Sequence, residues 1–169
     1  MEQTPEKTGA GNTDVYEWSL RNYAGIKKEP YSPPIYSRVP LVYVTPDTFV
    51  FGKTSGMMTS WVSYSEWQWE LMKGRDGLPE GLKKEVADIT RNATSDKEKI
   101  KALYDFLAAT TRYVSMQIGL GGFQPMTVEE VYKNKFGDCK ALSFYMQAML
   151  AECGIDYYYT EIGGKNRTL

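Results

Sequence analysis

Apolar residues in the second half of the chain recur three or four positions apart, which is the spacing of amphipathic helices. In the helix expected after Ser95, one stripe is formed by Ile100, Leu103, Leu107 and Thr111. The same pattern predicts helices at Gly81–Asn92, Val128–Asn134 and Asp138–Glu152, and a short aromatic helix at Glu66–Met72. Ser65 is expected to cap the aromatic helix, and Gly154 to end the last one.

Two of these helices begin with a sequence typical of a capping box, in which a Ser or Thr and a Glu three residues later satisfy free backbone N–H groups. The pairs are Ser95 with Glu98 and Thr127 with Glu130. We therefore expect helices to start directly after Ser95 and Thr127.

Runs of β-branched and aromatic residues predict strands elsewhere. They lie at Val15–Leu20, Pro40–Thr45, Thr48–Phe51 and Ile155–Ile162, with an extended segment at Tyr113–Ile118. Proline has no N–H for a β-ladder, so the proline-rich stretch from Pro30 to Pro46 is expected to be edge strand or connector. The pattern predicts an α+β fold: the helix at Asp138–Glu152 packs on an antiparallel sheet that contains Ile155–Ile162, and the N-terminal region is mostly β and proline-rich.

The composition limits the classes of function. The chain has 169 residues, of which 42% are hydrophobic, enough for one domain or for one domain and part of another. Twenty basic and 21 acidic side chains leave a net charge of −1, and no basic stripe follows the sequence, so we expect no nucleic-acid partner. No apolar run approaches the roughly 18 residues of a membrane span, and the residues after Met1 lack the apolar stretch of a signal peptide, so no membrane insertion is expected.

Cys139 is the candidate for chemistry, because it follows Gly137 at the start of a predicted helix. Free backbone N–H groups and the positive end of the helix dipole favour a thiolate there. The chain contains no histidine, however, so the usual general base for a cysteine nucleophile is missing. Two interpretations stay open: a structural thiol, or a nucleophile whose remaining catalytic groups lie beyond Leu169.

The neighbours of Cys139 have simpler explanations than catalysis. Asp138 is predicted to be the N-cap of the helix that carries Cys139. Lys140 either stabilises a thiolate or is an ordinary surface lysine. Cys153 fits the apolar stripe of the same helix and is assigned to the core. Fourteen residues of helix would hold the two cysteines roughly 21 Å apart, whereas a disulfide needs Cα atoms within about 7 Å, so we expect two free thiols.

No cofactor or metal ion is expected. The cluster at Gly119–Gly122 lacks the downstream Gly-Lys-Ser/Thr of a phosphate-binding loop. The tryptophans and tyrosines raise the alternative of carbohydrate stacking, but aromatic residues mostly form core.

Four segments between Ser95 and Gly163 together resemble a known catalytic core. They are Ser95–Ile100, Tyr113–Gly119, Gly122–Pro125 and above all Phe136–Ser143, in which Phe-Gly-Asp-Cys opens a helix. This pattern resembles the N-terminal half of a transglutaminase-like core, a relative of the papain-type cysteine enzymes. Upstream, the pieces Tyr16–Trp18, Ala24–Tyr31 and Pro33–Pro34 resemble the end of a β-rich domain of unknown function that often precedes such cores in bacteria.

The resemblance implies a Cys139 nucleophile that attacks a protein or peptide amide and forms a thioester, with Gln117 as the candidate second donor to the oxyanion. Family members complete a Cys-His-Asp triad from two later strands, and neither partner is present here. We therefore expect a fragment that is inactive alone, from a cysteine acyl-transferase or peptidase. The alternative is a non-catalytic binding or scaffold module of a bacterial envelope protein.

The same resemblance suggests how the chain is organised. We expect a disordered leader at 1–14, the end of an upstream β-rich domain and a linker at 15–58, and the N-terminal part of the core at 59–169. It implies a longer parent protein that is periplasmic or secreted. An exposed edge at Ile155–Ile162 would favour self-association.

Overall fold

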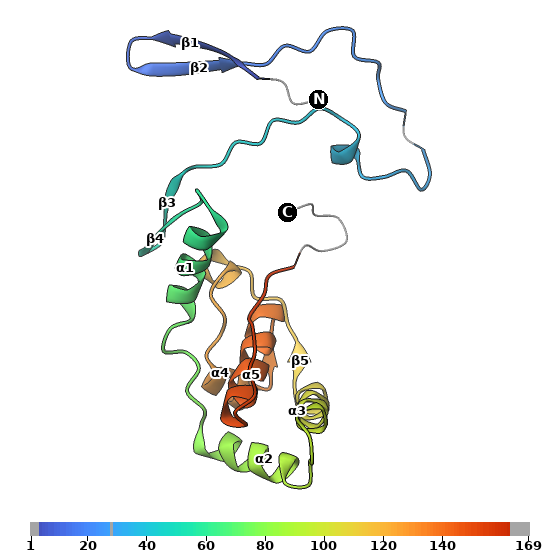
Figure 1. The fold of residues 1–169 in the computed structure, drawn as a ribbon, viewed down its shortest axis with the longest axis vertical. Coiled ribbons are helices and arrows are strands. Elements are labelled where there is room, and N and C mark those ends of the chain that lie inside the picture. Colours follow the sequence, from blue (N-terminus) through green and yellow to red (C-terminus); the bar gives the residue numbers. More distant parts are fainter. Residues whose placement is uncertain (1–3, 28, 163–169) are drawn as a thin grey trace. The chain divides into compact units, whose positions relative to one another are not determined.

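The computed structural model describes residues 4–27 and 29–162. The contacts divide the chain into two units, one that ends at Val42 and one that begins at Tyr43, and each is described by itself (Figure 1). Within the described residues, no helix combines the length and the apolar character that a membrane span requires.

The first unit contains a β-hairpin near its start. Strands β1 (Glu6–Ala10) and β2 (Thr13–Glu17) pair antiparallel, with Ala10 opposite Thr13. Gly11 takes a positive φ of 67° in the two-residue turn, where other residues would be strained. Strands therefore occupy part of 1–14, where the sequence predicts a disordered leader. The sequence feature that indicates this hairpin is the Gly11-Asn12 pair in its turn. The predicted domain boundaries stay a prediction.

The predicted strand at Pro40–Thr45 is absent, because Pro40 has no N–H to donate and Pro46 follows directly. The next prediction is confirmed: β3 (Thr48–Phe51) pairs antiparallel with β4 (Thr54–Met57), a strand that the pattern did not indicate. This hairpin belongs to the second unit, and aromatic contacts join it to the helix that follows. The rings of Phe49 and Trp67 meet edge to face with centroids 4.8 Å apart.

Five helices follow in the second unit. They are α1 (Trp61–Met72), α2 (Glu80–Thr90), α3 (Asp96–Thr110), α4 (Val128–Asn134) and α5 (Cys139–Glu152). The predicted starts of α3 and α4 are confirmed. The hydroxyl of Ser95 accepts from the N–H of Glu98, and Thr127 and Glu130 form a reciprocal capping box. The start of α1 was predicted five residues too late: Ser60, not Ser65, caps it, and Ser63 completes the box.

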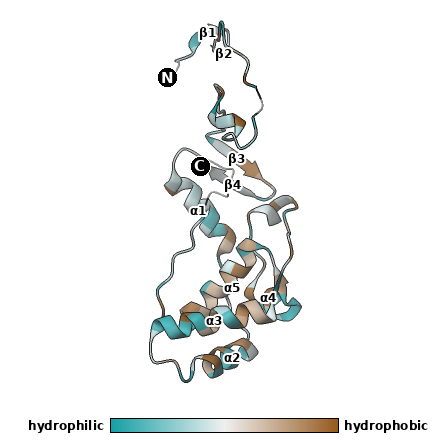
Figure 2. Cartoon of the chain, turned by 90° about the vertical axis from the view of Figure 1, so that its right-hand side faces the viewer, coloured by the Kyte–Doolittle hydropathy of each residue, from teal (hydrophilic) through white to brown (hydrophobic). Residues whose placement is uncertain are grey.

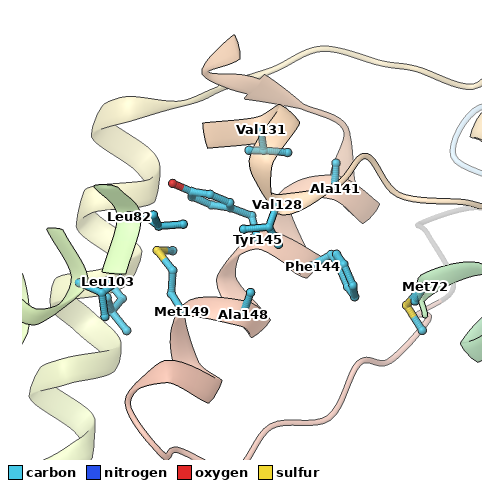
Figure 3. Packing of buried hydrophobic residues seen from close by; sticks show 11 residues of the cluster. Met72, Leu82, Leu103, Val128, Val131, Ala141, Phe144, Tyr145, Ala148 and Met149 are labelled. Carbon is cyan, nitrogen blue, oxygen red and sulfur yellow. The ribbon is translucent and has the colours of Figure 1, made fainter. Parts of the chain in front are cut away.

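The hydrophobic core is built around α5. Helices α2, α3 and α4 all contact α5 (Figures 1 and 2). The largest buried side chains belong to α5. Phe144, Tyr145 and Met149 of α5 have at most 2% of their surface exposed. Figure 3 shows Tyr145 and Met149 facing Leu82 of α2 and Leu103 of α3, whereas Phe144 lies on the side of Met72 of α1.

The C-terminal end of α5 is closed by a Schellman motif. Gly154 adopts a φ of 68°, its N–H donates to the carbonyl of Ala151, and the N–H of Ile155 donates to that of Leu150. The chain thereby turns back sharply, and the segment from Ile155 to Ile162 runs along the helix surface.

The predicted strand at Ile155–Ile162 is wrong, and with it the antiparallel sheet under α5. The segment has no regular structure, because a strand needs a partner and no described segment pairs with it. Among the described residues, the strands beside α5 are a two-residue parallel pair, β5 (Arg112–Tyr113) with β6 (Phe136–Gly137). The fold is α+β, but α5 packs mainly on helices. Self-association through this segment stays a prediction.

Leu103 is fully buried on α3, whereas Ile100, on the predicted stripe one turn earlier, is 40% exposed. Leu103→Ala is expected to lower the free energy of unfolding by about 2–5 kcal/mol, because it removes core contacts and leaves a cavity. Ile100→Ala, the matched control, should cost less than about 1 kcal/mol. Urea unfolding followed by far-UV circular dichroism measures both, and equal losses would contradict this account of the core.

Candidate functional site

Cys139 is the first residue of α5, and the structure fixes its backbone from both sides. The parallel pairing of β5 and β6 holds the preceding residues: the N–H of Arg112 donates to Lys135 and that of Val114 to Gly137, at 3.1 and 2.9 Å. Gly137 is buried, and a Cβ there would lie 2.9 Å from the Cβ of Ala141, so only glycine fits without a shift. The turn therefore presents Cys139 at a defined place, with its side chain exposed.

Asp138 caps the helix as the sequence predicts. Its carboxylate accepts from the N–H of Ala141 at 3.0 Å, and its other oxygen forms an ion pair with the ammonium of Lys140. The side chains are 3% and 13% exposed, respectively, so this is a buried pair. Lys140 is thus engaged by a carboxylate beside Cys139, which weakens its predicted role as a thiolate partner.

A groove of about 840 Å³ runs past Cys139. Its walls come from α3, α5 and the segment 157–162, with Gln117 and Phe123 at one side. The two candidate site residues of the sequence, Cys139 and Gln117, both line it. Gln117 is exposed and lies between β5 and the 3-10 turn Gly119–Gly122, so its part as an oxyanion donor stays a prediction.

Cys153 lies elsewhere. It is the C-terminal cap of α5, is partly buried and packs against the core, and it does not line the groove. Both cysteines are free, as predicted. The fold therefore separates one exposed thiol at a helix N-terminus from one packed thiol at the C-terminus.

The wall opposite α5 is held by a polar network that the sequence did not reveal. The carboxylate of Glu161 accepts from the hydroxyl of Tyr64 at 3.2 Å and from the amide of Gln68 at 3.3 Å. Gln68 also donates to the Tyr64 oxygen at 2.9 Å. Burial, together with Glu161 nearby, raises the pKa of Tyr64, so this hydroxyl stays a donor at neutral pH.

Two further groove residues escaped the sequence analysis. Tyr159 is half-buried, and burial, with smaller effects from the charges of Glu161 and Cys139, raises the pKa of its hydroxyl to about 12. Gln147 of α5 is 6% exposed, and its carbonyl oxygen accepts no hydrogen bond within the described part of the chain. Neither carries a sequence motif. Only the path of the chain after Gly154 places Tyr159 in this groove.

Polar groups of the groove are suited to binding a neutral polar ligand next to the exposed thiol of Cys139. A metal centre is not indicated, since no three Cys, Asp or Glu side chains within residues 4–27 and 29–162 gather closely enough to hold an ion.

Asp138→Ala is expected to destabilise the protein by about 3–5 kcal/mol, because it leaves Lys140 buried without its partner and removes a helix cap. Asp138→Asn should cost less, since its amide oxygen can still accept from Ala141. The exposed pair of Glu80 and Lys83 on α2 provides the control, and Glu80→Ala should change stability by less than about 1 kcal/mol. Urea midpoints compare the three, and a neutral Asp138→Ala would show that the ion pair contributes nothing.

Comparison with known proteins agrees with this architecture. No curated protein and no solved structure matches the chain. Residues 83–160 match the sequence model of the transglutaminase-like superfamily. The matched stretch spans most of α2, all of α3, α4 and α5, and the groove wall as far as Thr160, so this part of the chain is similar to the transglutaminase-like superfamily.

Proposed function

We propose that Cys139 is the nucleophile of a cysteine acyl-transfer or peptidase site that acts on protein or peptide amides. The observation that carries the proposal is its position: an exposed thiol on the first residue of α5, in the wall of a groove large enough for an extended peptide. The free N–H groups and the helix dipole stabilise negative charge on this sulfur and on an oxygen bound beside it.

In the proposed reaction, the sulfur of Cys139 bonds to the amide carbon and the carbonyl π electrons move to the oxygen. Collapse of this tetrahedral species breaks the C–N bond, the nitrogen leaves with a proton, and a thioester remains. An amine or water then releases the acyl group. The N–H of Cys139 and the side chain of Gln117 are the proposed donors to the oxyanion.

Proton transfer is the demanding part of this scheme for the chain as it stands. The sequence contains no histidine. Asp138 is buried, caps α5 and pairs with Lys140, so it is a poor proton acceptor for the thiol. We propose that an imidazole and its orienting carboxylate come from outside these 169 residues.

The missing histidine also favours a second function, a binding or scaffold module that keeps the groove without the chemistry. The groove has apolar walls, hydrogen-bonding groups and exposed tyrosines, which suffice to hold a peptide without a covalent step. Measurements of thiol reactivity and of turnover separate the two functions.

Cys139 should react several-fold faster with iodoacetamide than Cys153. It is exposed at the positive end of α5, whereas Cys153 is partly buried at the negative end. Mass spectrometry of partly alkylated protein measures the two sites. Cys139→Ser should remove the fast phase and Cys153→Ser should leave it, while faster labelling of Cys153 would contradict the assignment of the nucleophile.

The 169-residue chain alone is expected to show no release of ammonia from a glutamine peptide and no incorporation of a fluorescent amine, because no base lies beside the thiol. A longer form that adds a histidine and an aspartate should turn over, and Cys139→Ala should abolish that activity. Turnover by the short chain that Cys139→Ala removes would show that another base suffices. An inactive longer form with both residues would favour the binding module.

A further inference from the structure

Tyr159 is a groove residue that the proposed mechanism has not yet used. Its ring packs against the buried cluster around α5, and the residue lines the groove that Cys139 lines. Within the described residues its hydroxyl makes no hydrogen bond. A half-buried phenol normally finds a partner, so this hydroxyl is available to a ligand.

The electrostatic surroundings keep the Tyr159 hydroxyl in its donating form. Its pKa is raised to about 12, first by burial and then by the negative charges of Glu161, Cys139 and Asp138. The proton therefore stays in place through the neutral range.

Gln147 gives independent evidence that the groove is shaped for a ligand. Its side chain is 94% buried in the groove wall formed by α5, yet its carbonyl oxygen has no donor among the described residues. Buried acceptors of this kind are rare in proteins and usually await water or a bound group.

We propose that the Tyr159 hydroxyl donates a hydrogen bond to the carbonyl oxygen of the acyl group that Cys139 attacks. The donation strengthens as that oxygen gains charge, so Tyr159 lowers the barrier to acylation rather than merely holding the substrate. The inference rests on the proposed function of Cys139. It adds a donor from the segment 157–162, which lines the same groove as Cys139.

A stoichiometric reaction tests this without any histidine. With 4-nitrophenyl acetate, the thiolate of Cys139 bonds to the acetyl carbon, the carbonyl electrons move to oxygen, and collapse expels 4-nitrophenolate and leaves an acetyl thioester. The thiol proton passes to the buffer. With 4,4′-dithiodipyridine, the same thiolate attacks sulfur, a mixed disulfide forms, pyridine-4-thiolate leaves, and no oxyanion develops.

Tyr159→Phe keeps the ring that packs on the core and removes only the hydroxyl. In a Cys153→Ser background, it should slow acetylation of Cys139 by about 10-fold or more, while the rate of disulfide exchange stays unchanged. Tyr43→Phe is the control, because Tyr43 is 77% exposed and does not line the groove, and it should alter neither rate. Release of nitrophenolate gives the rates, and peptide mass spectrometry locates the acetyl group.

The outcomes separate the donor from the nucleophile. Equal acetylation rates for Tyr159→Phe and the parent, with the acetyl group on Cys139, would overturn the role of Tyr159 and leave the nucleophile intact. A loss of both acetylation and disulfide exchange would also overturn it, since a general change at the thiol would then be the cause. No acetyl group on Cys139 in the parent protein would overturn the proposed function itself, and the donor with it. If Gln117→Ala alone slows acetylation, the donor is Gln117.

Discussion

The burial of α5 is the interaction on which the rest of the second unit depends. Phe144, Tyr145 and Met149 are almost fully buried, and α2, α3 and α4 all contact α5 (Figure 3). The same helix carries Cys139 at its first residue, so core packing and thiol position are set by one element. A shift of α5 that relieved a packing defect would also move the sulfur relative to the groove.

The N-terminal turn of α5 is fixed by contacts that leave little freedom. Strand pairing holds Gly137, a close approach to Ala141 excludes a side chain there, and Asp138 caps the helix while paired with Lys140. The backbone N–H groups of the first turn lie beside Cys139, and the positive field that they provide is a property of the helix itself.

Features encoded within a few residues could be predicted from the sequence, and those that depend on distant segments could not. The caps formed by Ser95, Thr127 and Asp138 were correct, because each cap and its target lie three residues apart. The start of α1 was wrong because two serines, Ser60 and Ser65, both suit a cap, and packing against β4 decides between them. The strand at Ile155–Ile162 had the right composition, but composition provides no partner. Cys139 was identified by its local turn, whereas Tyr159 and Gln147 join the groove only through tertiary packing.

The groove combines features suited to binding with an incomplete set for turnover. Its far wall is tethered where Glu161 accepts from Tyr64 and Gln68, which fixes the position of Tyr159 relative to α5. Hydrogen-bond donors, an acceptor in Gln147 and an exposed sulfur are all present, while the sequence lacks an imidazole. Binding and a single acylation need only the hydrogen-bonding groups and the sulfur. Repeated turnover needs an imidazole as well. Under the proposed function, the contribution of each groove residue to a single acylation can therefore be measured separately from that of a base, whereas the members of a complete triad act as a unit and hide such contributions.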